Sequence, residues 1–112
     1  MKNKDVIVLK KILEYCNQVS EACDMFGNDY DKFVGVSVFQ NACCMCILQI
    51  GKLCKVISEE LKDSEKKIPW RAWCGIRDIF AHQYSNLDHQ SAWDTIQNDL
   101  PVLKKEVERI LK

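Results

Sequence analysis

The sequence predicts an all-α protein, an up-and-down four-helix bundle that forms a single domain over residues 1–112. Apolar side chains recur at steps of three and four residues over most of the chain, which is the period of an amphipathic helix. The chain has 112 residues and is 47% apolar, enough for one compact core and too short for two. Residues 34–38 alternate like a strand, but no other segment offers a partner strand.

The first helix is expected from about Lys4 to Ala22 or slightly beyond. Gly27-Asn28-Asp29 should stop it, because glycine and asparagine favour turns over helix interiors. Its apolar side repeats at three- and four-residue steps and comprises Val6, Leu9, Leu13, Cys16, Ser20 and Cys23.

A second helix is expected to run to about Lys62. Ser37 and Gln40 have the spacing of a capping box at its start. Its middle is apolar on more faces than one four-helix core needs, which favours either a dimer or a central, enclosed helix. The polar stretch from Lys62 to Lys67 should then form a loop.

Two further helices complete the predicted bundle. Pro69 suits a position just before or within the first turn of a third helix. Asp88 is a candidate N-cap for the last helix, and Pro101 should kink or restart that helix. The packing stripe of the last helix comprises Trp93, Ile96, Leu100, Leu103, Val107 and Ile110.

Composition limits the classes of function. The longest apolar run, residues 42–48, is too short for a membrane span, and the start of the chain does not resemble a signal peptide, so we expect a cytoplasmic protein without membrane contact. The seven cysteines are an odd number and should be reduced core residues. The balance of 16 basic and 16 acidic residues argues against a protein that coats long nucleic acids, although a local basic patch remains possible. That patch would comprise Lys62, Lys66, Lys67, Arg71 and Arg77.

The candidate site is the segment from Arg77 to Tyr84, which holds a permanent cation, a carboxylate at Asp78, an imidazole at His82 and a phenol. Arginine presents a planar fork of donors that matches phosphate oxygens, and histidine is the usual proton-transfer group near neutral pH. With an unperturbed pKa of about 6.5, an imidazole can act as general acid or base. Together these groups could cleave RNA without a metal or a cofactor.

Helical geometry separates a packing side from a wet side of the third helix. Trp73, Ile76, Ile79 and Phe80 should face the core, whereas Arg71, Asp78 and His82 should face solvent. Asp78 lies four residues before His82 and can orient its ring. Arg77 and His82 are about 140° apart around the helix, so either the guanidinium reaches across or two protomers share the site.

Each feature also has a plainer interpretation. Arginine, aspartate and histidine on one helix are more often an ordinary ion-pair network than a nuclease site. Trp70 should pack in the core, although it could stack on a base. His89 should be a solvent-exposed loop or helix-start residue, because no dependable set of metal ligands surrounds it.

The spacing of Arg77, His82 and Tyr84 is also that of the Arg-x4-His-x-Tyr motif of HEPN proteins. The order of Ile50-Gly51, Ile68-Pro69-Trp70-Arg71, Trp93 and Leu100-Pro101-x-Leu103 resembles the HepT-like HEPN family from about Asp5 to Leu111. One departure is Lys52-Leu53, where many relatives have glutamate and alanine, so no role of that glutamate can be carried over.

This resemblance implies the toxin of a toxin–antitoxin pair, a homodimeric, metal-independent endoribonuclease with Arg77 and His82 as catalytic residues. It also implies an MntA-type minimal nucleotidyltransferase as antitoxin, with Tyr84 as the residue that it adenylylates. The alternative is a non-catalytic module that binds substrate or nucleotide for such a nucleotidyltransferase.

Overall fold

The computed structural model describes the backbone of residues 1–82 and 88–112 and the side chains of residues 1–76 and 88–112. The described residues are helical, with short connections and no strand, so the predicted all-α fold is confirmed. The elements are α1 (Asn3–Phe26), α2 (Tyr30–Gly35), α3 (Ser37–Lys55), α4 (Glu59–Ser64), α5 (Trp70–His82), α6 (His89–Asp94), the π-helical segment η2 (Thr95–Asp99) and α7 (Leu100–Leu111).

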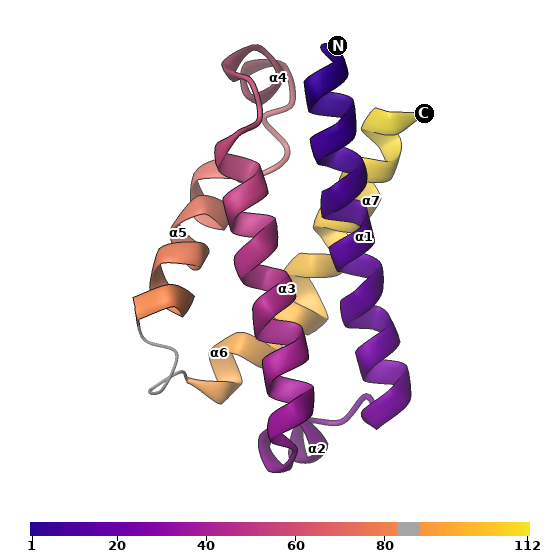
Figure 1. Ribbon diagram of the computed structural model, residues 1–112, viewed down its shortest axis with the longest axis vertical. Coiled ribbons are helices and arrows are strands. Elements are labelled where there is room, and N and C mark those ends of the chain that lie inside the picture. Colours follow the sequence, from indigo (N-terminus) through magenta and orange to yellow (C-terminus); the bar gives the residue numbers. More distant parts are fainter. Residues whose placement is uncertain (83–87) are drawn as a thin grey trace.

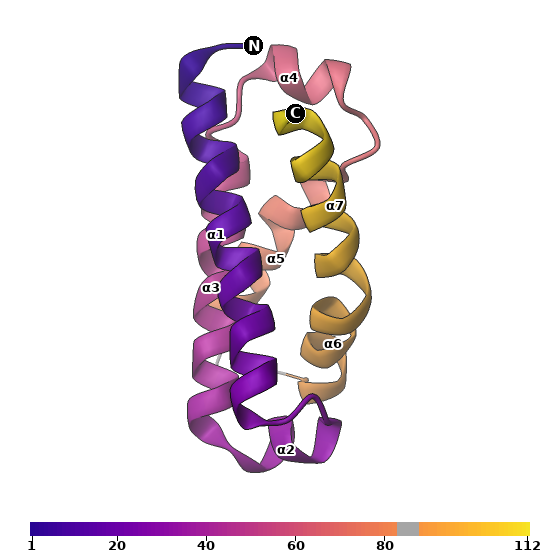
Figure 2. The ribbon, with the colours of Figure 1, turned by 90° about the vertical axis from the view of Figure 1, so that its right-hand side faces the viewer.

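The long helices stand side by side in an elongated bundle that measures 42 × 27 × 19 Å (Figure 1). α3 lies between α1 and α5, and α1 also packs against α7. α4 and both chain ends lie at one end of the bundle, and α2 lies at the other (Figure 2).

α1 continues for one turn past Ala22 and ends at the predicted stop, Gly27. Gly27 has a φ of +100°, a conformation that suits glycine, and its N–H donates to Cys23 O at 3.0 Å. The extra turn is held by the ring of Phe26, which stacks on Phe39 of α3 at a centroid distance of 5.3 Å. The stop signal is local, whereas the last turn depends on a partner in another helix.

The predicted second helix begins within one residue of the expected start, but its cap and its end are wrong, because the region up to Lys62 is divided between α3 and α4. Ser37 does not cap α3, since Val36 holds the N-cap position without a side-chain hydrogen bond. Gln40 points back instead, and its Nε2 donates to the carbonyl oxygens of Phe33 and Val34, both at 2.8 Å. The Ser37 and Gln40 spacing therefore marks the junction of α2 and α3, and residues 34–38 form no strand but belong to these two helices and the Val36 cap between them.

α3 ends at Lys55, and α4 occupies part of the stretch predicted to be a loop. Ser58 caps α4, because its Oγ accepts from the N–H of Leu61 at 3.2 Å. The connection to α5 is left with residues 65–69. Pro69 immediately precedes α5, as predicted.

The carboxylate of Asp5 in α1 accepts hydrogen bonds from Ser58, the N-cap residue of α4, although the two are 53 residues apart in the sequence. The carboxylate is only 2% exposed and accepts from Ser58 N at 3.0 Å and from Ser58 Oγ at 2.5 Å. Burial alone would raise the pKa of Asp5, but the hydrogen bonds from Ser58 and the charges of Lys2 and Lys4 hold it below its usual value. The ionised carboxylate thus stabilises the contact between α1 and α4.

Replacing Asp5 with asparagine is expected to lower the free energy of unfolding by about 1–3 kcal/mol at neutral pH, because the amide cannot accept both Ser58 bonds as a carboxylate does. A depressed pKa stabilises the protein above the unfolded-state value of about 3.9, and that stabilisation is lost as pH falls through the folded-state pKa. Urea unfolding at several pH values measures the difference, with the exposed Asp63→Asn as control. Equal stability of wild type and Asp5→Asn at pH 7 would contradict the assignment.

The last helix begins and restarts at the predicted residues. The side chain of Asp88 accepts from the N–H groups of Gln90 at 3.0 Å and Ser91 at 3.5 Å, so the predicted N-cap is confirmed. Pro101 has no N–H and falls at the start of α7, directly after the π-helical turn of η2. The wider turn lets the chain accommodate Pro101 and continue as α7.

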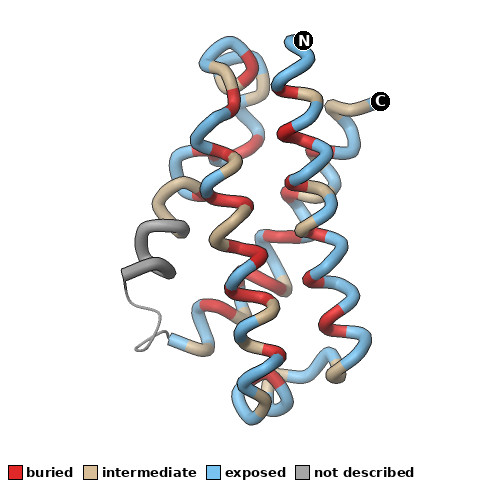
Figure 3. Tube along the Cα trace, viewed as in Figure 1, coloured by how far each residue is buried: buried red, intermediate tan, exposed pale blue. Residues whose placement is uncertain are grey.

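The core is centred on α3, which packs against α1, α2 and α5 and has buried residues along most of its length (Figure 3). They are Phe39, Cys43, Cys44, Cys46, Ile47, Ile50, Gly51 and Cys54. α3 has the length and apolar composition of a helix that could cross a membrane, but these residues fill the core of the bundle. The apolarity that suggested a dimer is thus largely used within one chain, which favours the central-helix interpretation.

The cysteines are reduced, and all except the half-buried Cys74 are buried, as expected of core residues. Burial raises the pKa of Cys44 to about 11 and, with smaller effects from neighbours, that of Cys16 to about 12. Both thiols therefore stay neutral at physiological pH and behave as small apolar groups.

Candidate functional site on helix α5

The predicted catalytic residues share one helix. The backbone atoms of Arg77, Asp78 and His82 belong to α5, and His82 is the last residue of that helix. Their side chains lie outside the described residues, and Tyr84 lies in residues 83–87, which are outside them altogether. The roles assigned to these four residues therefore remain predictions, and the described structure defines what holds the segment in place.

Two tryptophans anchor the first half of α5. Trp73 is 2% exposed and Trp70 is 7% exposed. The indole Nε1–H of Trp70 donates to Glu65 O at 3.1 Å, so this ring closes the connection from α4 to α5. Its interpretation as a core residue is confirmed, and stacking on a base would require it to leave this position.

The described part of α5 agrees with the predicted division into a packing side and a wet side. Trp73 is buried, and Ile76 is half-buried against the core. Arg71 is exposed, and among the described residues it has neither a hydrogen bond nor an ion pair. Asp78 and His82 follow Arg71 by seven and eleven residues, so the helical period places all three positions on the same face of α5.

The chain is anchored again directly after the motif, by the contacts of α6 with α2 and α3. Phe33 of α2 packs against Trp93 at 5.2 Å between ring centroids and edge-on against His89 at 6.3 Å. His89 is therefore half-buried, and the prediction that it is solvent-exposed is wrong, although it does begin α6. Across the part of the chain that the structure describes, no group of histidine, cysteine and carboxylate side chains is arranged to hold a metal ion.

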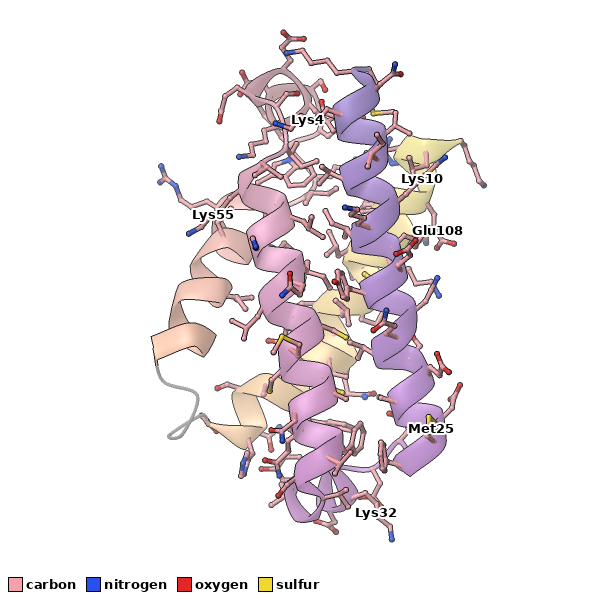
Figure 4. The ribbon with its side chains drawn as sticks, viewed as in Figure 1. Lys4, Lys10, Met25, Lys32, Lys55 and Glu108 are labelled. Carbon is pink, nitrogen blue, oxygen red and sulfur yellow. The ribbon has the colours of Figure 1, made fainter. Side chains whose placement is uncertain are left out.

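The basic patch predicted around the motif is only partly as expected. The side chain of Lys62 is partly covered, and its Nζ lies 3.8 Å from Oε1 of Glu59, whereas Lys66 and Lys67 are exposed. Two lysines outside the predicted patch, Lys52 and Lys55, lie in the last turn of α3, and Lys55 is labelled in Figure 4. Only the antiparallel packing of α3 on α5 brings them near the start of α5.

A hollow of about 470 Å³ lies at the end of the bundle that carries α4 and both chain ends, and its lining does not favour it as the functional site. It is lined by Met1, Lys2, Asp5, Ser58, Glu60, Leu61, Ser64, Glu65 and Ile110. Its acidic groups already have partners, because Asp5 accepts from Ser58 and Glu65 pairs with Arg109 at 2.6 Å. We therefore assign it to the structural fastening of α1, α4 and α7.

The fold and the sequence together define a small helical protein with an Arg-x4-His-x-Tyr motif whose Arg77 and His82 lie on an anchored helix. The model of the family described as "Ribonuclease HepT-like" matches residues 12–110. The chain belongs to this HepT-like HEPN family of ribonucleases, as its motifs suggested.

Similar proteins carry ribonuclease names. "Putative RNase MJ1380" of Methanocaldococcus jannaschii is 30% identical, over 96% of this chain and 98% of that protein. "Putative RNase MJ1216" of the same organism is 30% identical, over 93% and 84%. "Probable ribonuclease HepT" of Thermococcus cleftensis is 28% identical, over 88% and 94%. No solved structure matches the chain significantly.

Proposed function

We propose that this protein is the toxin of a toxin–antitoxin pair and acts in the cytoplasm as a metal-independent endoribonuclease. The observation that carries the proposal is the family match over residues 12–110, combined with an Arg-x4-His-x-Tyr sequence whose Arg77 and His82 lie on the backbone of α5. The ribonuclease names of similar proteins support an RNA substrate.

The proposed reaction is an internal transfer of the RNA phosphoryl group. The 2′-oxygen forms a bond to phosphorus while the bond to the leaving 5′-oxygen breaks. The 2′-hydroxyl proton passes to a base, and a proton is delivered to the 5′-oxygen, which leaves a 2′,3′-cyclic phosphate and a 5′-hydroxyl. His82 acts in this reaction as the general base that takes the 2′-hydroxyl proton or as the general acid that protonates the 5′-oxygen. Arg77 stabilises the negative charge on the phosphoryl oxygens.

Asp78 and Arg71 have supporting roles in this proposal. Asp78 lies one helical turn before His82, where a carboxylate can orient an imidazole. Arg71 is exposed on the same helical register, where it can hold a neighbouring phosphate. Neither group needs to exchange a proton with the substrate.

The decisive test is cleavage of a labelled single-stranded RNA by the purified protein in excess EDTA. We expect cleavage to continue and to yield cyclic phosphate ends. Cleavage that depends on added Mg²⁺ would contradict metal independence. Absence of cleavage under both conditions would favour the non-catalytic binding module.

We further propose that the active form is a homodimer in which two copies of the α5 motif form one cleft. Support comes from the ideal separation of about 140° between Arg77 and His82 on one helix, which a second protomer would bridge. The exposed apolar residues Val38 and Met45 leave part of α3 available for contact, at 63% and 55% exposure. Light scattering at micromolar concentration should give twice the chain mass. A monomer that cleaves RNA fully would exclude a shared cleft.

The antitoxin is proposed to be an MntA-type nucleotidyltransferase that adenylylates Tyr84. An added AMP would bring a negative phosphate two residues from His82, where it competes with RNA for the Arg77 guanidinium. The expected result is a gain of one or more AMP masses on wild-type protein incubated with the partner and ATP, and none on Tyr84→Phe. Intact-mass spectrometry measures it, with Tyr30→Phe as the matched control. Equal modification of wild type and Tyr84→Phe would exclude Tyr84.

A further inference from the structure

Two thiols meet where α1 packs against α3. Cys23 belongs to α1 and is 7% exposed, and Cys43 belongs to α3 and is fully buried. A hydrogen bond joins their side chains, in which the Cys43 thiol donates to the Cys23 sulfur. This pair has a reaction open to it that an isolated buried thiol lacks, which is the formation of a disulfide.

Contacts on either side fix how α1 and α3 align at this pair. The two helices run antiparallel, so residues late in α1 meet residues early in α3 (Figure 1). On one side of the pair, Phe26 stacks on Phe39 at 5.3 Å between ring centroids. On the other side, Cys46 Sγ donates to Gln18 Oε1 at 3.6 Å. The thiol pair lies between these contacts on both helices, which hold the two backbones together around it.

A disulfide at this position requires little movement of the backbone. Its sulfurs lie about 2.05 Å apart, and the two Cα atoms lie roughly 4.4–6.8 Å apart. Packed helices have axes about 8–10 Å apart, with the Cα atoms about 2.3 Å from each axis, so facing residues fall within that Cα range. Because the two thiols are already in hydrogen-bond contact, rotation of the side chains is the main change that bond formation needs.

Cys23 is the thiol of this pair that is suited to react first. The hydrogen bond from Cys43 holds the pKa of Cys23 below its usual value, although burial and the charge of Asp24 oppose that effect. Burial raises the pKa of Cys46 and that of Cys54. Since the thiolate is the nucleophile, Cys23 is favoured over both of these thiols.

We propose that Cys23 and Cys43 form a reversible disulfide when the protein meets hydrogen peroxide, and that this bond ties α1 to α3 and stabilises the folded chain. The inference is independent of the proposed nuclease activity. In a protein of the cytoplasm such a bond would be transient, because small reducing thiols reverse it by exchange.

The reaction has two steps. The Cys23 sulfur first attacks one peroxide oxygen, the O–O bond breaks, and the other oxygen leaves as water with the proton of Cys23. The Cys43 sulfur then attacks the sulfur of the resulting sulfenic acid, the S–O bond breaks, and the hydroxyl leaves as water with the proton of Cys43. Two thiols are thereby oxidised to one disulfide, and one peroxide is reduced to two waters.

The bond would close a loop that contains α2. Closing a loop removes freedom from the unfolded chain and so favours the folded state. The same loop carries Phe33, whose ring packs against Trp93 of α6 at 5.2 Å between ring centroids. The disulfide should therefore strengthen the end of the bundle where α2 and α6 meet.

The bond is tested by counting free thiols after oxidation. All proteins carry Cys74→Ala, because the half-buried Cys74 would react with peroxide by itself. Each protein is treated with equimolar hydrogen peroxide, unfolded, alkylated with N-ethylmaleimide and measured by intact-mass spectrometry. The parent protein should lose two alkylation sites and regain both after dithiothreitol, whereas Cys23→Ala and Cys43→Ala should form no disulfide within the chain. Cys16→Ala and Cys44→Ala each remove a neighbouring buried thiol and are the matched controls, which should still lose two sites.

Urea unfolding tests the stabilisation. The oxidised parent should unfold at a midpoint higher by about 1 M or more than the reduced parent, and peroxide should not raise the midpoint of Cys23→Ala or Cys43→Ala. Circular dichroism confirms that each variant is helical, and Cys23→Ala serves alone if Cys43→Ala does not fold.

Four outcomes would overturn the inference. They are no loss of alkylation sites in the parent protein, loss of two sites that persists in Cys23→Ala, a product of twice the chain mass that only a reductant separates, and a midpoint that oxidation leaves unchanged or lowers. None of these measurements involves RNA cleavage, so failure of the nuclease assignment would leave this inference unaffected.

Discussion

Replacing His82 with alanine is expected to lower the rate of RNA cleavage by about 10²-fold or more. A positioned acid or base typically contributes about 10²- to 10⁴-fold, and His82 is the only histidine on α5. Single-turnover cleavage of a labelled RNA at saturating protein measures the chemical step apart from binding. His82→Gln should be equally impaired, because an amide keeps the polarity of the side chain but does not transfer a proton near neutral pH.

The matched control for His82 is His89, the other histidine of the chain. His89 packs edge-on against Phe33 at the start of α6, so His89→Ala should affect stability more than the rate per folded molecule. A His82→Ala protein that cleaves RNA at more than a tenth of the wild-type rate would exclude His82 as the proton-transfer group. Loss of helical signal in the same protein would require the comparison to be repeated with His82→Gln.

Arg77→Ala should lower the single-turnover rate to a similar extent, because it removes the fork of donors that stabilises the phosphoryl group in the transition state. Arg77→Lys keeps the charge but loses the bidentate geometry, so partial recovery is expected. The control is Arg109→Ala, since Arg109 is bound to Glu65 and Glu106 at the other end of the bundle. Full activity of Arg77→Ala would contradict its assignment.

The parts of the fold that could be predicted from sequence depend on signals within a few residues. Gly27 ends α1 because it can adopt positive φ, Asp88 caps α6 through its own carboxylate, and Pro101 interrupts the last helix because it has no N–H. Each of these effects acts on the adjacent backbone, so periodicity and residue type were sufficient. The burial of Trp73 and exposure of Arg71 followed from helical period in the same way.

The parts that could not be predicted depend on contacts between distant residues. Ser58 caps a separate helix because Asp5, 53 residues away, fixes its hydroxyl. The indole of Trp70 donates to the carbonyl of Glu65 in the preceding connection, a partner that the expected place of Trp70 in the core does not specify. Lys52 becomes a neighbour of α5 only through helix packing. Sequence reasoning therefore located the motif but not the surface that surrounds it.

The aromatic cluster beside α6 provides the last large expected effect, on stability. Phe33 is fully buried and contacts Phe39 edge-on at 5.4 Å and Trp93 at 5.2 Å between ring centroids. It thereby joins α2, α3 and α6, the helix that follows the proposed catalytic segment in the sequence. Phe33→Ala leaves a cavity at this junction and should cost about 3–5 kcal/mol of unfolding free energy.

Urea unfolding measures this cost, and the control is Val34→Ala in the same helix, which removes a partly exposed side chain and should cost well under half as much. Phe33→Leu should lie between them, because leucine fills part of the cavity. A loss below about 1 kcal/mol for Phe33→Ala would show that α6 is not held by this ring. Since small domains have only about 5–15 kcal/mol of stability, the expected loss would leave much of the population unfolded on mild heating. RNA cleavage should then fall with the folded fraction while the rate per folded molecule stays near that of wild type, in contrast to His82→Ala, where folding persists and the chemistry is lost.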